Sequence, residues 1–239
     1  MKITSVKPFL FFPGVGKNLL FTRVETDEGI YGWGEGYVVQ GKEKAIAAYV
    51  ESIAPYLIDR SPFEIKHLGR ALFNDFTSRR SSSDFFSAWS SIEIALWDIV
   101  GKKLDQPIYN LLGGPSRSHI RAYANGWYDV NFGGDDTPDG MAERAKRVKA
   151  MGYTAMKWDP FGRIPWRNDI SQKTEDWAVE CVKKIREAVG EHTDLLIEVH
   201  RRLSPYHAVH FAKRIEEYHP FWFEEPCLAD NVDLLTQVR

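Results

Sequence analysis

The C-terminal half of the chain, after Gly113-Gly114-Pro115, alternates short apolar segments with longer segments whose apolar residues recur every three or four positions. The first pattern predicts strands that are covered on both faces, and the second predicts amphipathic helices. Regular alternation of the two favours a parallel sheet with right-handed crossovers. The predicted strands are residues 121–125, 154–157, 195–198 and 221–223, and the predicted helices are residues 141–151, 177–189 and 208–218.

A parallel sheet of this kind is either open or part of a barrel. A closed barrel of eight strand–helix units takes about 250 residues, whereas this half of the chain supplies only four predicted strands and three predicted helices. We therefore predict an α/β fold which, if it is a barrel, contains about half of one.

The N-terminal half follows a different plan, with strands first and helices after them. Thr26-Asp27-Glu28-Gly29 is a good hairpin turn, and the apolar residues of the last helix, Phe86, Trp89, Ile92, Leu96 and Ile99, lie three or four apart. We therefore predict an α+β domain at residues 1–114 and the α/β domain at residues 115–239. The predicted strands are residues 3–12, 19–25 and 30–33, and the predicted helices are residues 45–57, 65–76 and 83–101.

The composition excludes several classes of protein. Among 239 residues, 31 Lys and Arg oppose 33 Asp and Glu, and 44% are hydrophobic, which is the balance of a folded globular chain. The net charge of −2 provides no basic field for nucleic acid, and no apolar run is long enough to cross a bilayer. Cys181 and Cys227 lie too far apart for a metal knuckle. We expect a cytoplasmic protein with neither nucleic acid nor membrane as a partner.

Three of the predicted strands end in an ionisable residue, namely Lys157, Glu198 and Glu224. Successive residues of this set are about one strand–helix unit apart, so parallel strands would bring them to one edge of the sheet, where the sites of such folds lie. A single carboxylate at a strand end is more often salt-bridged or solvated than a ligand, but here three positions coincide. Two carboxylates that approach each other favour a hard cation, so we predict that Glu198 and Glu224 bind Mg²⁺.

His200 follows Glu198 by two positions. On an extended strand the two side chains would point to the same side, and imidazole transfers protons near neutral pH. We predict that His200 is the general acid of this site.

Several longer motifs resemble the mandelate racemase and muconate lactonizing enzyme branch of the enolase superfamily, along essentially the whole chain. Residues 157–162 and 197–200 are, more narrowly, similar to members that dehydrate sugar acids, especially gluconate or galactonate dehydratases, as are residues 123–128. The motifs that resemble the family as a whole are Ser91-Ile92-Glu93-Ile94-Ala95-Leu96-Trp97-Asp98, Gly101-Lys102, Pro107, Leu111-Leu112-Gly113-Gly114 and Phe223-Glu224-Glu225-Pro226.

The resemblance implies an N-terminal capping domain and a modified (β/α)₇β barrel whose strand ends hold Mg²⁺, with Glu198 and Glu224 as the first two ligands. It also implies that Lys157 steadies the anionic substrate. Asn125 and Asp159 would hold substrate hydroxyls, although either side chain would equally serve to cap a neighbouring loop. A small sugar acid would be the substrate, and the protein would form a homo-oligomer.

The sequence departs from the common pattern of the family in three ways. Glu198 stands where many relatives have aspartate, which keeps the charge. Asp159 replaces the second lysine of a Lys-x-Lys motif, which makes racemisation less favourable. The third metal carboxylate, and a His–Asp pair that acts as base, belong in the family to strands after residue 239, so we expect this chain to be truncated.

These observations predict a Mg²⁺-dependent dehydratase of an aldonic acid such as gluconate or galactonate. It would be a carbon–oxygen lyase that forms a 2-keto-3-deoxy acid through an enediolate. A cycloisomerase or epimerase that uses the same enediolate on another acid is one alternative. A truncated, non-catalytic fragment that associates through its exposed half-barrel edge is the other.

Overall fold

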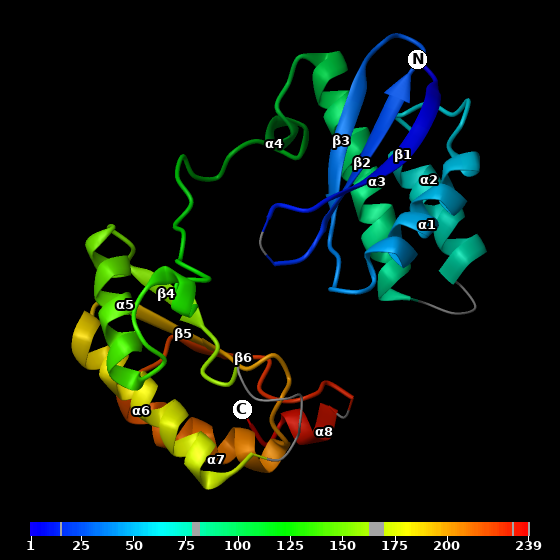
Figure 1. Cartoon of the computed structure of the whole chain (residues 1–239). Coiled ribbons are helices and arrows are strands. Elements are labelled where there is room, and N and C mark those ends of the chain that lie inside the picture. The colour runs from blue at the N-terminus through cyan, green and yellow to red at the C-terminus, as the bar shows by residue number, and fades with distance from the viewer. Residues whose placement is uncertain (15, 78–81, 163–169, 231, 239) are drawn as a thin grey trace. The chain divides into compact units, whose positions relative to one another are not determined.

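The computed structural model describes residues 1–14, 16–77, 82–162, 170–230 and 232–238. The chain divides into two compact units, Met1–Ser118 and His119–Arg239, each with its own hydrophobic core. The division lies a few residues after the predicted boundary at Gly114. Figure 1 shows a sheet with helices packed on it in each unit.

The first unit is built on an antiparallel sheet of three strands in the order β1-β2-β3. The predicted hairpin turn is present, and the amide of Thr26 donates to the carbonyl of Ile30 across it. Along β2, side chains alternate between buried and half-buried, as expected for a sheet with one covered face. The strands are β1 (Ile3–Phe11), β2 (Leu19–Thr26) and β3 (Tyr31–Gly36).

The long helix α3 (Ser83–Leu104) packs directly on β3, and glycine in β3 permits the contact. A Cβ on Gly32 would lie 2.0 Å from the carbonyl oxygen of Ala95, and one on Gly34 would lie 1.9 Å from that of Ser91. Asp98 fixes the same pair of elements, since its Oδ2 accepts the amide of Trp33 at 3.0 Å. The glycines of the Gly-Trp-Gly-Glu-Gly segment therefore serve packing.

The helices of the first unit differ in detail from the predictions. The N-cap of α3 is Ser82, whose side chain accepts the amide of Asp84, and Phe85 rather than Phe86 is buried. The predicted helix at 65–76 is divided into an α-helix and a π-helical turn. The remaining elements are α1 (Glu43–Ile53), the 3₁₀ turn Ala54–Tyr56, α2 (Ile65–Leu72), the π-helical turn Phe73–Thr77 and α4 (Ile108–Leu111).

The second unit contains a parallel sheet in the sequential order β4-β5-β6. These strands are β4 (Ala155–Trp158), β5 (Asp194–Glu198) and β6 (Trp222–Glu224). The predicted strand at 121–125 is only partly confirmed, because the structure shows a single parallel bridge there, between Ala124 and Met156. An order that follows the sequence is that of a singly wound barrel sheet.

The helices of the second unit lie along one side of this sheet (Figure 1). Each of the three long helices begins at a Ser or Thr whose side chain accepts a backbone amide of the first turn: Thr137, Ser171 and Ser204. The helices are α5 (Pro138–Ala150), α6 (Gln172–Val189), α7 (Pro205–Ile215) and α8 (Val232–Leu235), with 3₁₀ turns at Val130–Phe132 and Glu216–Tyr218. Within the described ranges, we find no helix that combines the length and the apolar character required to cross a membrane.

Candidate functional site at the strand ends

Lys157, Glu198 and Glu224 converge at the carboxyl ends of β4, β5 and β6. Glu198 pairs with Glu224 in the register of the sheet, and Lys157 is level with Leu196, two residues before Glu198. All three side chains therefore project from the same face. The Lys157 ammonium lies 2.7 Å from Oε2 of Glu198 and 3.3 Å from both carboxylate oxygens of Glu224.

The electrostatics of this group favour a permanently charged lysine. The Lys157 side chain is only 10% exposed. Burial acts to lower the pKa of Lys157, but the hydrogen bonds and charges of Glu198 and Glu224 outweigh it and raise this pKa above the ordinary value. Lys157 is thus suited to stabilise an anion and unsuited to accept a proton.

His200 joins this group, but not in the way that the sequence predicted. Its Nε2 lies 3.3 Å from Oε1 of Glu198, and its Nδ1 lies 2.7 Å from Oδ2 of Asp159. The prediction assumed an extended backbone, whereas β5 ends at Glu198 and both His200 and Arg201 adopt left-handed φ angles of 49° and 60°. The turn is held by the Arg201 amide, which donates to the carbonyl of Glu225 at 2.8 Å. Left-handed backbone at residues with a Cβ is strained and is often found at functional sites.

Asp159 was predicted to hold substrate hydroxyls, and its surroundings favour a different role. Its side chain is 3% exposed, and Oδ2 contacts both His200 and the guanidinium of Arg202. Its Oδ1 accepts the amide of Phe161 at 2.8 Å. Asp159 also lines a pocket of about 160 Å³ beside Tyr128, but its carboxylate already contacts three nitrogen atoms, those of Phe161, His200 and Arg202.

Asn125 is placed by local contacts. Its Oδ1 accepts the amide of the next residue, Gly126, at 2.9 Å, which is the loop-capping contact that the sequence left open as an alternative. Asn125 follows Ala124, which forms the bridge to β4. The contacts given above connect the other five predicted site residues, Lys157, Asp159, Glu198, His200 and Glu224, to one another.

Sequence reasoning missed four residues around this group. The ring of Tyr123 lies 5.7 Å from the Lys157 ammonium, and Trp127 donates its Nε1 proton to the carbonyl of Lys157 at 2.9 Å. Burial, followed by the charges of Asp159 and Glu198, raises the pKa of the Tyr128 phenol. Arg202 is the fourth. Tyr123, Trp127 and Tyr128 flank Asn125 in sequence, so the aromatic character of that segment was the available signal.

The residues present supply part of a Mg²⁺ site. Glu198 and Glu224 offer carboxylate oxygens, which are the ligands that Mg²⁺ prefers. Lys157 pairs with both carboxylates in this structure, and no group of three His, Cys, Asp or Glu side chains in the described part of the chain is arranged around a common metal position. The chemical nature of the donors fits Mg²⁺, with two carboxylates provided by this chain.

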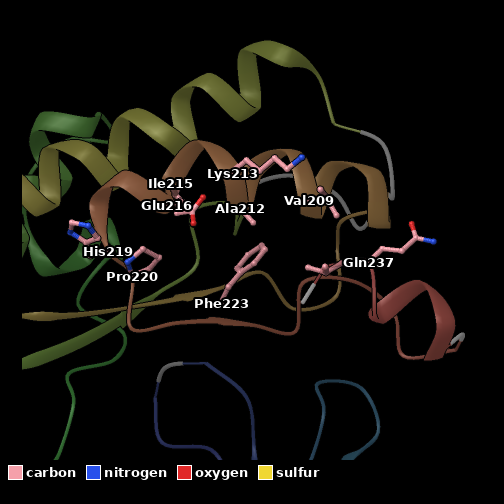
Figure 2. Close-up of a pocket in the computed structure, with 10 residues that line it drawn as sticks. Val209, Ala212, Lys213, Ile215, Glu216, His219, Pro220, Phe223 and Gln237 are labelled. Carbon is pink, nitrogen blue, oxygen red and sulfur yellow. The ribbon is translucent and has the colours of Figure 1, made fainter.

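A larger pocket, of about 570 Å³, lies elsewhere in the second unit. Figure 2 shows it between α7 and β6, with the ring of Phe223 pointing towards the helix and Gln237 at one end. None of the six predicted site residues lines it. Phe223 lies on the face of β6 opposite to Glu224, so the pocket belongs to the helix side of the sheet.

The chain matches known proteins in both units. Residues 14–113 match the N-terminal domain of mandelate racemase / muconate lactonizing enzyme, and residues 140–239 match the enolase C-terminal domain-like family. The chain is 37% identical to a D-gluconate dehydratase of Thermoproteus tenax over 90% of its own length and 42% of that protein. It is 34% identical to a D-galactonate dehydratase of Klebsiella pneumoniae over 98% of its own length and 57% of that protein.

Solved structures show the same likeness. The crystal structure of a mandelate racemase/muconate lactonizing enzyme from Jannaschia sp. CCS1 is 32% identical, with a TM-score of 0.88 over 100% of this chain and 64% of that one. A member of the enolase superfamily from Salmonella Typhimurium has a TM-score of 0.88 and 30% identity over 99% of this chain and 64% of that one. The chain spans about half the length of the curated relatives that it matches.

Proposed function

The chain belongs to the mandelate racemase/muconate lactonizing enzyme family of the enolase superfamily, and we propose that it forms the capping domain and the first part of the barrel of a sugar acid dehydratase. The observation that carries this proposal is the convergence of Lys157, Glu198 and Glu224 at three adjacent strand ends, with His200 beside them. Gluconate and galactonate are the proposed substrates, because the relatives at 34–37% identity are named for them. A cytoplasmic location and assembly into a homo-oligomer complete the proposal.

Each residue has a distinct proposed role. Glu198 and Glu224 would hold Mg²⁺, which supplies electrostatic stabilisation for the charge that develops on the substrate carboxylate as the neighbouring proton is removed. The Lys157 ammonium stabilises the same anionic end of the substrate. Asn125 would be a hydrogen-bonding partner for substrate hydroxyls. The base that removes the proton is expected from the His–Asp pair of later strands.

His200 is the proposed acid for loss of water. Because Nδ1 faces Asp159, Nε2 is the nitrogen that would donate its proton to the leaving hydroxyl, which departs as water. The resulting enol then ketonises to the 2-keto-3-deoxy acid. Asp159 at the second position of the Lys-x-Lys motif supports dehydration over racemisation, since it removes the basic group from that face.

The experiment is to read the coding DNA past residue 239, to express the open reading frame as it stands, and to incubate the protein with Mg²⁺ and with gluconate or galactonate. We expect a 2-keto-3-deoxy acid from a protein that includes the His–Asp pair, and a rate at least about 100-fold lower in its Glu198→Gln and Glu224→Gln variants. Glu225→Gln is the matched control, because it removes the charge of the adjacent glutamate, whose carboxylate pairs with Arg201 at 3.4 Å instead of with Lys157. A cyclised or epimerised acid would favour the cycloisomerase or epimerase alternative. Absence of any product together with absence of Mg²⁺ binding by calorimetry would favour the non-catalytic fragment.

A further inference from the structure

Asp159, His200 and Arg202 form a buried cluster beside the proposed metal ligands, and we propose that Asp159 is a positioning residue which sets the orientation and the protonated nitrogen of His200. This inference rests on the proposed function, since it explains how the acid of that reaction is prepared. It replaces substrate binding as the role of Asp159. The sequence identified both residues but gave no sign that they form a pair.

The first argument is the geometry of the Asp159 carboxylate, which is fixed at both oxygens. The backbone amide of Phe161 donates to Oδ1 at 2.8 Å, so the carboxylate plane is tied to the turn after β4. Oδ2 then faces Nδ1 of His200 at 2.7 Å. The guanidinium of Arg202 contacts the same Oδ2 and compensates its charge, and both Asp159 and Arg202 are buried.

The second argument concerns the proton. An ionised carboxylate only accepts hydrogen bonds, so a ring nitrogen that is hydrogen-bonded to it carries a proton. Both ring nitrogens of His200 face a carboxylate, but the contact of Nδ1 with Asp159, at 2.7 Å, is the shorter one, so Nδ1 is the protonated nitrogen when the ring is neutral. The other nitrogen, Nε2, lies 3.3 Å from Oε1 of Glu198 and is the one available to exchange a proton beside the metal ligands. Carboxylates that fix the tautomer of a functional histidine in this way are common in metal sites.

The third argument is the backbone. His200 and Arg201 are held at left-handed φ angles of 49° and 60°, a conformation that costs free energy for residues with a Cβ. Arg202 follows at once and reaches back to Asp159. A surface ion pair does not need a strained backbone. Here the strained turn brings both the histidine and the arginine into contact with one carboxylate, and these contacts hold the imidazole ring in one orientation.

The test reads the His200 ring directly, without any assay of turnover. The whole chain is labelled with ¹⁵N-histidine, and the two ring nitrogens are observed by long-range ¹H–¹⁵N NMR at a pH above the titration of the ring. His200→Gln identifies the signals. We expect Nδ1 of His200 to carry the proton in the unmodified chain.

Asp159→Ala supplies the opposite case. It removes the carboxylate that faces Nδ1, while the Glu198 carboxylate still faces Nε2 at 3.3 Å, so the proton of the neutral ring moves to Nε2. Glu175→Gln is the matched control, because Glu175 lies 2.6 Å from Nδ1 of His210 and 3.9 Å from Nδ1 of His207, so it should change the signals of these two rings and leave those of His200 unchanged.

Two results would overturn the proposal: a proton on Nε2 of His200 in the unmodified chain, or an unchanged tautomer in Asp159→Ala. If Asp159→Ala does not fold, the spectrum of the unmodified chain alone decides. A purely structural ion pair between Asp159 and Arg202 would leave the ring proton where it is. Failure to form a keto acid would count against the proposed function and leave this measurement unaffected, so the two are tested separately.

Discussion

The second unit contains the same chemical arrangement twice, once at the strand ends and once between two helices. The rim cluster is Asp159, His200 and Arg202, and the helix cluster is Glu175, His210 and Arg214. In both, a carboxylate that is 3% exposed faces Nδ1 of a histidine, at 2.7 Å in the rim cluster and 2.6 Å in the helix cluster. In both, an arginine contacts the same carboxylate oxygen as the histidine.

The surroundings of the two clusters differ. His210 lies within the regular helix α7, is 44% exposed and stacks on Tyr206 with an interplanar angle of 11°. His200 lies on a left-handed turn, and its second nitrogen faces Glu198. A carboxylate, a histidine and an arginine in contact are therefore no site by themselves. The rim cluster becomes a candidate site through the additional carboxylates and the lysine beside it.

The largest expected effect tests the similarity of the clusters. Asp159→Ala and Glu175→Ala should each lower the free energy of unfolding by up to about 3 kcal/mol, because each removes a buried carboxylate that contacts both a histidine and an arginine. Urea unfolding followed by circular dichroism measures this. Glu187→Ala, at an exposed position of α6, should change stability by no more than about 0.5 kcal/mol. A loss below about 1 kcal/mol in either cluster would show that its carboxylate is not an essential partner.

Stabilisation by Mg²⁺ should depend on the carboxylates beside the rim cluster and not on the helix cluster. At a concentration of about 100 times its dissociation constant, a ligand that binds only the folded chain stabilises it by about 2.7 kcal/mol. We expect this increase in the unmodified chain and in Glu175→Gln, and less than half of it in Glu224→Gln. Thermal unfolding with and without Mg²⁺ measures the difference. An equal response in all three proteins would place the bound ion elsewhere.

The third test concerns Lys157 and pH. The pKa of Lys157 is raised above its ordinary value of 10.5, so the ammonium keeps its charge from about pH 4 to 7 and loses it only as the pH rises through the folded-state pKa. Any change in its effect between about pH 4 and 7 therefore comes from the two carboxylates that it faces. In Lys157→Met, Glu198 and Glu224 face each other without the ammonium, which disfavours their ionised forms. Stability relative to the unmodified chain should then fall by about 2 kcal/mol as the pH rises from about 4 to 7.

Unfolding at both ends of that pH range tests this expectation. Lys213→Met is the control, since Lys213 is exposed on α7 and lines the pocket on the helix side of the sheet. A constant difference between Lys157→Met and the unmodified chain across the range would mean that the two carboxylates do not depend on Lys157.

Periodicity predicted most elements of the fold, because helices and buried strands leave regular apolar patterns in a sequence. It failed at residues 121–125, where one bridge replaces the predicted strand. It also missed the role of Gly32 and Gly34, since a close approach between a strand and a helix depends on residues far apart in the chain. The choice between Phe85 and Phe86 depends on the rotation of α3, which spacing alone leaves open.

The strand-end rule predicted that Lys157, Glu198 and Glu224 converge, as they do, because parallel strands bring their carboxyl ends together. His200 was predicted on the assumption of an extended strand, whereas a left-handed turn places its side chain there. Arg202 and the pairing of Asp159 with His200 depend on contacts between segments 41 and 43 residues apart, for which the sequence carries no local signal. The helix cluster was likewise invisible, because Glu175 lies on a different helix from His210 and Arg214.

The smallest expected effect comes from Ser204, which lies between Arg202 of the rim cluster and His210 of the helix cluster in sequence. Its side chain accepts the amide of His207 at 3.3 Å and caps α7, the helix that carries His210 and Arg214. Ser204→Ala should therefore cost about 1 kcal/mol of stability, whereas Ser116→Ala, at an exposed position, should cost almost nothing. Because the strained turn at His200 is held by the carbonyl of Glu225 and by Asp159, the ring proton of His200 should stay on Nδ1 in Ser204→Ala. A displaced proton in that variant would mean that the cap of α7, and with it the helix cluster, also positions the rim cluster.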